Sequence, residues 1–255
     1  MPEPRARALL SAEPLEALPR ASLRARAADV LRFAARPTPY HARHAWNAAL
    51  VAALASIFAM HLAVDWAAVW LLEAWDDRAG LLPAPQEETR PFGTMVFSAV
   101  VLAPVLEEAL HRGWMSGQIA ALRFAAYGFA ATGCLLAGLA VGEQGRGLCL
   151  LLAVMIALAG FVRWLQTRER DRALPAWFTR HFAALVWAGS LFFAAIHLGA
   201  YEPLTHPLGV LVVTPQLIGG LFLAYVRTRL GLRAAMLHHA AYNAVALAIM
   251  MEPWS

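Results

Sequence analysis

Seven long apolar runs constrain the fold of this chain more than any other feature of its sequence. Each has about the length, roughly 20 residues, that an α-helix needs to cross the hydrocarbon core of a bilayer. Only helices and closed β-barrels satisfy the backbone in lipid, and these runs are too long and continuous for barrel strands. The sequence therefore predicts an all-α, polytopic membrane helical bundle of about seven transmembrane helices, at 46–72, 93–111, 124–142, 147–165, 181–198, 208–226 and 232–251.

The composition disfavours most other classes of protein. Of the 255 residues, 60% are hydrophobic and 15% are charged, whereas a soluble domain is about half apolar and about a quarter charged. A water-soluble domain, a disordered chain and a disulfide-stapled secreted domain are therefore not expected. The basic residues lie between the apolar runs rather than along one basic face, so we predict no nucleic-acid partner.

Arginine placement predicts how the chain is oriented, because basic residues favour the cytoplasmic side of a membrane. All 21 basic residues are arginine. With a cytoplasmic N-terminus, 18 of them fall on the inside, and only Arg78, Arg90 and Arg146 fall in outer loops. Lysine codons are AT-rich, so the absence of lysine favours a GC-rich bacterial genome. We predict a multi-pass protein of the bacterial inner (plasma) membrane with its N-terminus in the cytoplasm.

Ionisable side chains within the apolar runs are the candidates for chemistry, because each is costly at membrane depth and usually faces a cavity. Glu107, Glu108, His111 and Arg112 form the first group. On a helix Glu108 and Arg112 share one face and can form a salt bridge, while Glu107 and His111 share the neighbouring face. One carboxylate would then be paired and the other available for proton transfer. The alternative is a solvated helix end at the cytoplasmic surface.

Two later groups place imidazoles in apolar runs. Phe193 and His197 are four residues apart, and so are His239 and Asn243, so each pair shares a helix face. Such groups can simply join helices to one another. Together with the glutamates, however, they supply a carboxylate base and imidazole and amide donors that can stabilise an oxyanion. This set is suited to peptide hydrolysis with water as the nucleophile.

The three groups resemble the motifs of the CAAX prenyl protease 2 and bacteriocin-processing family of intramembrane endopeptidases, known as the CPBP or Abi family. One motif alone is weak, but three in order within apolar helices are specific. The resemblance covers about residues 92–250. The family patterns EExxxR, FxxxH and HxxxN read here as Glu107 to Arg112, Phe193 to His197 and His239 to Asn243.

The resemblance implies hydrolysis of a peptide bond near a membrane-associated or lipidated, C-terminal segment of a protein substrate. Glu107 would be the base that activates water, helped by His197. Glu108 with Arg112 would orient the site. Membrane lipids and such a protein substrate are the expected partners, and processing of CAAX proteins, sorting of C-terminal anchors and bacteriocin immunity all stay open.

The resemblance also implies a set of binding residues. His239 and Asn243 would hold the substrate carbonyl or the oxyanion, and Phe193 would contact the substrate. Members of this family have been described both as metalloproteases and as glutamate-type proteases. Zinc, if present, would be held by Glu108, His197 and His239 with one position open. There is no HExxH motif, and we commit to no cofactor.

The spacing of the motifs departs from the family pattern. Between Arg112 and His197 lie 84 residues with two extra apolar runs, which predict an added helical hairpin at about 124–165. Such a hairpin preserves the topology and could enlarge a substrate gate or bind a partner. The predicted divisions are an Arg-rich cytoplasmic segment with a short amphipathic helix, a first transmembrane helix with its outer loop, and the protease-like domain, at 1–45, 46–91 and 92–251.

Three other functions stay open. A multi-helix haem protein would use His197 and His239 as ligands, but it would leave the glutamates without a role. A non-catalytic immunity or scaffold protein would use the polar groups only to bind a partner. A transporter can also carry carboxylates at membrane depth, but the sequence shows no repeats or paired broken helices.

Overall fold

The computed structural model describes residues 21–39 and 44–251, which form helices joined by short connections. The predicted all-α class is confirmed, since these residues contain one isolated β-bridge and no strand. A large part of the predicted segment 1–45 lies outside the described residues. The α-helices are α2 (Leu23–Ala35), α3 (Ala48–Ala79), α4 (Phe92–Val96), α5 (Ala103–Arg112), α6 (Ile119–Leu139), α7 (Glu143–Thr167), α8 (Ala176–Ile196), α9 (Thr214–Arg229) and α10 (Leu232–Met251).

Tighter or wider helical turns join several of these helices. A π-helical segment, η3 (Phe97–Leu102), connects α4 to α5. Short 3₁₀ helices follow α5 and α8 and precede α9, and they are η4 (Gly113–Ser116), η5 (His197–Ala200) and η6 (Pro207–Val213).

Six helices of the described chain are long and apolar enough to cross a membrane. They coincide with the first six predicted runs, and they are Ala48–Ala79, Phe92–Ser116, Ile119–Leu139, Glu143–Thr167, Ala176–Ala200 and Pro207–Arg229. The seventh predicted run forms the 20-residue helix α10. It is not among the six, and it carries Arg233, two histidines and Asn243. The protein is therefore a multi-pass membrane protein with six candidate spans in its described residues, and a crossing by α10, the seventh predicted run, stays a prediction.

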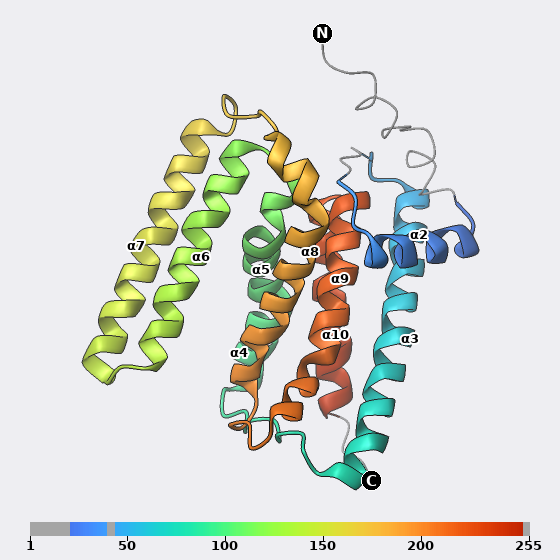
Figure 1. Cartoon of the computed structure of the whole chain (residues 1–255), viewed down its shortest axis with the longest axis vertical. Helices are drawn as coiled ribbons and strands as arrows, with labels where there is room; N and C mark the ends of the chain where they lie inside the picture. The colour runs from blue at the N-terminus through green and yellow to red at the C-terminus, as the bar shows by residue number, and fades with distance from the viewer. Residues whose placement is uncertain (1–20, 40–43, 252–255) are drawn as a thin grey trace. The chain divides into compact units, whose positions relative to one another are not determined.

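Contacts between the helices divide the chain into two units, one made of 1–104 with 183–255 and the other of 105–182. In the first unit α3, α9 and α10 pack against one another, and α2 lies crosswise to α3 and α9 (Figure 1). Helix α2 occupies the place of the predicted amphipathic helix. Its cap is Ser22, whose Oγ accepts a hydrogen bond from the Ala25 N–H at 3.3 Å, as is usual at a helix start.

A buried ion pair ties α2 to α9. Arg229 Nε and the Tyr225 hydroxyl each donate to Asp29 Oδ2 at 3.1 Å, and the ring of Tyr225 meets that of Phe33 edge-on. From α8, Trp187 Nε1 donates to the Ala34 carbonyl at 3.1 Å. Because removing one partner of a buried pair leaves an uncompensated charge, α2 is an integral part of this unit.

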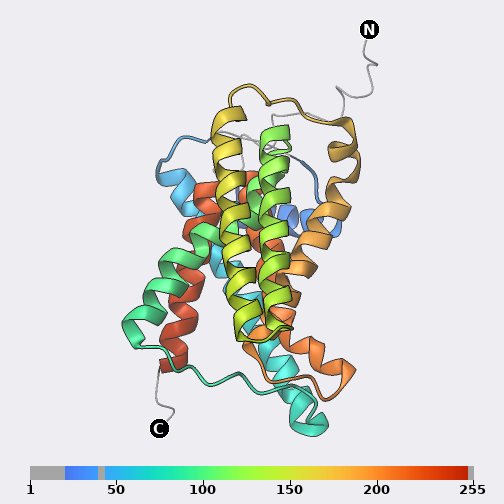
Figure 2. The ribbon, with the colours of Figure 1, turned by 90° about the vertical axis from the view of Figure 1, so that its left-hand side faces the viewer.

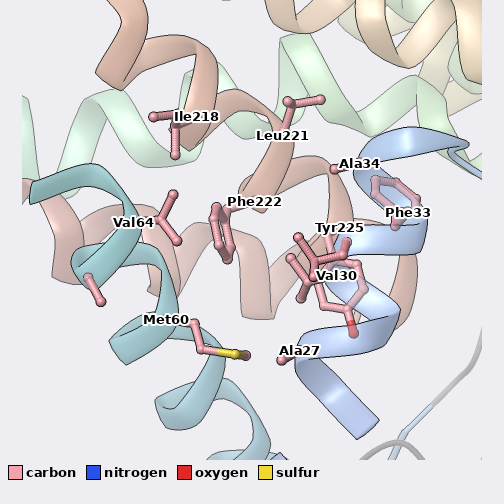
Figure 3. A pocket seen from close by; sticks show the side chains of 12 residues that line it. Ala27, Val30, Phe33, Ala34, Met60, Val64, Ile218, Leu221, Phe222 and Tyr225 are labelled. Carbon is pink, nitrogen blue, oxygen red and sulfur yellow. The ribbon is translucent and has the colours of Figure 1, made fainter. Parts of the chain in front are cut away.

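An apolar cavity of about 410 Å³ lies between α2, α3 and α9. Aliphatic and aromatic side chains make up nearly all of its wall, and Figure 3 shows them. One wall is Phe222 of α9 and another is Val64 of α3. The ring of Phe222 also stacks on that of His61 of α3.

In the second unit α6 and α7 run side by side as an antiparallel pair (Figure 2). These are the two extra helices that the sequence predicts within 124–165. They approach closely because Gly160 leaves room for Tyr127, and Gly128 likewise leaves room for Leu110 of α5. The hairpin therefore packs against α5, the helix that carries the two glutamates.

Candidate active site

Helix α5 continues directly from the π-helical segment η3, and a proline explains the change in winding. Pro104 has no N–H and its ring clashes with an ordinary α-helical turn before it. The Ala103 N–H donates instead to the Ser98 carbonyl, five residues back. With the same spacing of five residues, the Ala99 carbonyl would pair with the N–H of residue 104. Residue 104 is the proline, which has no N–H to donate. Wide turns of this kind are frequent at functional sites.

Asn243 of α10 supplies the missing donor. Its Nδ2 donates to the Ala99 carbonyl at 2.7 Å. An unpaired carbonyl is expensive inside a membrane, so this contact stabilises the wide turn. One of the predicted site residues therefore also supports the helix that leads into α5.

The two glutamates of α5 have different surroundings. Glu108 is fully buried and Arg112 is 2% exposed, and Arg112 Nη1 donates to Glu108 Oε1. The salt bridge that the sequence predicts is confirmed. Glu107 is only half-buried. One carboxylate is therefore neutralised by arginine within the protein, while its neighbour lies in a half-buried position.

His197 begins the 3₁₀ turn after α8, and its ring is held in one orientation. Its Nδ1 lies 2.7 Å from the Phe193 carbonyl oxygen. A carbonyl can only accept, so Nδ1 carries the proton and Nε2 of the neutral ring presents its lone pair. The Phe193 ring lies 4.7 Å from the imidazole, measured between centroids, which confirms the shared face that the spacing predicts.

Phe193 also brings the second and third motifs together. Its ring meets that of His239 edge-on at 6.1 Å between centroids. Both side chains are buried, with exposed fractions of 3% and 5%. Through Phe193, His197 and His239 therefore lie close together, although they belong to different helical segments. Helix α8 begins at Ala176, five residues before the predicted run.

The predicted site residues fall in both units of the chain. The first unit contains four of them, Phe193, His197, His239 and Asn243. The remaining three, Glu107, Glu108 and Arg112, share helix α5 of the second. That the two sets converge on one water-accessible cavity stays a prediction.

The structure groups together four polar residues that lie outside the three motifs. His61 Nδ1 lies 2.9 Å from His238 Nε2, and the Tyr242 hydroxyl donates to Asp65 Oδ2. The first pair joins α3 to α10, and so does the second. The signal was present in the spacing, because 61 with 65 and 238 with 242 are each one helical turn apart within apolar runs.

Possible metal ligands do not gather in the described residues. No group of three or more His, Cys, Asp or Glu side chains there is arranged to hold a metal ion. The zinc set that the resemblance implies contains Glu108, whose carboxylate accepts a hydrogen bond from Arg112.

A comparison with protein families gives one match. A family model described as type II CAAX prenyl endopeptidase, Rce1-like, matches residues 89–245. The matched segment contains all three motifs, whereas α2 and α3 precede it. Searches of curated proteins and of solved structures gave no match.

Proposed function

Since the chain belongs to the Rce1-like family of type II CAAX prenyl endopeptidases, we propose that it hydrolyses a peptide bond near a lipidated C-terminal segment of a protein substrate, with water activated by Glu107. Membership favours a protease over a haem protein, a scaffold or a transporter. The observation that carries the mechanism is the contrast between Glu108, buried and bonded to Arg112, and the half-buried Glu107.

In the proposed reaction Glu107 takes a proton from water as the water oxygen attacks the carbonyl carbon of the scissile bond. A general base must reach its proton directly or through one water. The C=O electrons move onto oxygen, and His239 and Asn243 donate hydrogen bonds to that oxyanion. When the carbonyl re-forms, the C–N bond breaks and the leaving amine receives the proton held by Glu107. A carboxylic acid and an amine result.

His197 is proposed to assist the attack. Its Nδ1–H is held by the Phe193 carbonyl, so Nε2 accepts a hydrogen bond from the attacking water and orients it. Glu108 has a different part, because its carboxylate is neutralised by Arg112. This pair holds the shape of α5 and keeps Glu107 in place.

We propose a reaction that uses no metal ion. Glu108 fits a zinc ligand poorly, because a cation bound there would lie beside the Arg112 guanidinium and share one carboxylate charge with it. We therefore expect cleavage to persist after treatment with a metal chelator. Loss of cleavage that added zinc restores would contradict the metal-free mechanism while leaving the protease activity in place.

The test of the function uses the full chain in liposomes and a quenched-fluorescent, farnesylated peptide that ends in a CAAX sequence. We expect fluorescence to rise and mass spectrometry to identify one cleaved bond. The same peptide without the farnesyl group is the matched control and should be cleaved more slowly. If neither peptide is cleaved, the proposed substrate class is wrong.

A further inference from the structure

A polar cluster joins α3 to α10 within the first unit, and we call it the α3–α10 clamp. It consists of His61, Asp65, His238 and Tyr242. One rung is the contact of 2.9 Å between His61 Nδ1 and His238 Nε2. The other is the hydrogen bond from the Tyr242 hydroxyl to Asp65 Oδ2. Because the two rungs lie one turn apart on both helices, together they set the rotation and the register of α10 against α3.

Three of the four side chains of the clamp are enclosed by protein, and Tyr242 is half-buried. His61, Asp65 and His238 are each 1% exposed. The His61 ring stacks on Phe222 at 4.7 Å and on Tyr242 at 4.6 Å, with interplanar angles of 21° and 17°. Ionisable groups in spanning segments are expensive and usually serve a function. The buried position of the ionisable groups of the clamp therefore indicates a role beyond packing.

The clamp and the third motif occupy adjacent faces of α10. Residues 238 and 242 face α3, and residues 239 and 243 follow each of them by one position, about 100° around the helix. On their own face, His239 meets Phe193 and Asn243 donates to the Ala99 carbonyl. Any rotation of α10 that breaks the clamp therefore moves both motif residues.

We infer that His61 and Asp65 of α3 are positioning residues for the proposed hydrolysis, acting through His238 and Tyr242 to fix where α10 presents His239 and Asn243. The inference rests on the proposed function. Helix α3 ends at Ala79, before the segment 89–245 that matches the family. His61 and Asp65 thus come from a part of the chain that the family match does not include, whereas His238 and Tyr242 lie within it.

Activity of three variants tests this role with the farnesylated CAAX peptide. Asp65→Leu and Tyr242→Phe should lower kcat by about tenfold to a hundredfold, as small misplacements of a catalytic group do, with little change in KM. Asp65→Asn keeps an oxygen that can accept from Tyr242, so it should retain most of the activity. A purely structural clamp would lower the yield of folded protein but leave kcat per folded molecule unchanged, and that result would overturn the inference.

The matched control is Val64→Ala, also on α3. Val64 lines the apolar cavity (Figure 3), so shortening it changes the helix without touching the clamp. Its kcat should stay at the wild-type value. An equal loss of kcat in Val64→Ala and Asp65→Leu would show that any disturbance of α3 lowers activity, and it would also overturn the inference.

A second readout does not depend on cleavage. In a chain with Cys134 and Cys149 replaced by serine, Ala99→Cys and Asn243→Cys place a thiol on each of the two residues that are joined by the hydrogen bond from the Asn243 side chain to the Ala99 backbone carbonyl. Oxidative crosslinking should be efficient, should largely disappear when Asp65→Leu is added, and should persist with Val64→Ala. Unchanged crosslinking in the Asp65→Leu chain contradicts the clamp. If Asp65→Leu abolishes crosslinking but the wild-type chain cleaves no CAAX peptide, the proposed function is overturned and the clamp is left standing.

Discussion

Glu107 and Glu108 are neighbours in the sequence but differ in what surrounds them. Adjacent residues of a helix point about 100° apart. On α5 this directs Glu108 toward Arg112 in a buried position and leaves Glu107 half-buried. The difference in surroundings assigns them different tasks, which two substitutions can separate.

We predict that Glu107→Gln abolishes cleavage and leaves the fold intact. Glutamine keeps the shape of glutamate but cannot accept a proton from water, and loss of a general base typically slows a reaction about 10²- to 10⁴-fold. Hydrolysis of the farnesylated peptide measures the first effect and thermal unfolding in detergent the second. Wild-type turnover in this variant would remove Glu107 from the mechanism.

Glu108→Gln should lower both stability and activity, because it leaves the Arg112 guanidinium buried without its carboxylate. Breaking a buried pair on one side costs about 3–5 kcal/mol. The control replaces both partners, as Glu108→Leu with Arg112→Met, and should recover much of the unfolding temperature but not the cleavage. Equal stability of Glu108→Gln and the wild type would contradict the assigned role of this pair.

At the scale of elements, the helix before the glutamates depends on a contact from another helix. Pro104 forces the wide turn, the turn leaves the Ala99 carbonyl without a backbone donor, and Asn243 supplies one. Asn243 therefore has two tasks, to support this carbonyl and, as proposed, to hold the oxyanion.

The two tasks of Asn243 separate in a pair of variants. Asn243→Leu should destabilise the protein by about 1–3 kcal/mol, the usual effect of leaving a buried acceptor unpaired. Adding Pro104→Ala restores an N–H at position 104 and should recover part of that stability. Cleavage should not return. Thermal unfolding and peptide hydrolysis are the measurements, and recovery of activity in the double variant would argue against the oxyanion role.

The hairpin of α6 and α7 depends on close approach at one glycine. A Cβ at Gly160 would lie 2.5 Å from Tyr127 Cβ, whereas a Cβ at Gly147 of the same helix would meet nothing within 4 Å. Gly160→Ala should therefore destabilise the protein by about 1–3 kcal/mol, as overpacking does. Gly147→Ala should be neutral or stabilising by about 0.5–1 kcal/mol. Similar unfolding temperatures for the two variants would contradict this packing.

At the scale of the whole molecule, the side of the membrane on which the chain ends depends on whether α10 crosses. Six described helices are candidate spans, and α10 follows them with 20 residues of its own. If α10 also crosses, the arginine bias places the C-terminus outside. Polar side chains of α10 would then bond to neighbouring segments, as those of His238, Tyr242 and Asn243 do.

Reporter fusions test this topology. An alkaline phosphatase fused after Ser255 should be active, because that enzyme works only outside the cytoplasm, and a green fluorescent protein at the same point should be dark. A fusion after Leu174, in the connection between α7 and α8 that we predict to be cytoplasmic, should give the opposite pair of results. A fluorescent fusion after Ser255 would show that α10 does not cross.

The sequence alone predicted where the helices lie and which local pairs form. Apolar length identifies a helix because lipid leaves the backbone few alternatives, and helical periodicity converts a spacing of four residues into contact. The sequence therefore predicts the contacts of Glu108 with Arg112 and of Phe193 with His197. It predicts the ends of helices less accurately, since α6 and α8 each begin five residues before the apolar run. Arginine in these first turns can extend its side chain away from lipid.

Contacts between helices were decided only by the tertiary structure. The pairs His61 with His238, Asp65 with Tyr242 and Asn243 with Ala99 join residues 144 to 177 positions apart. Sequence spacing says which residues share a face of one helix. The neighbour that this face meets depends on how the helices pack, and packing follows from the shapes of all the side chains between them.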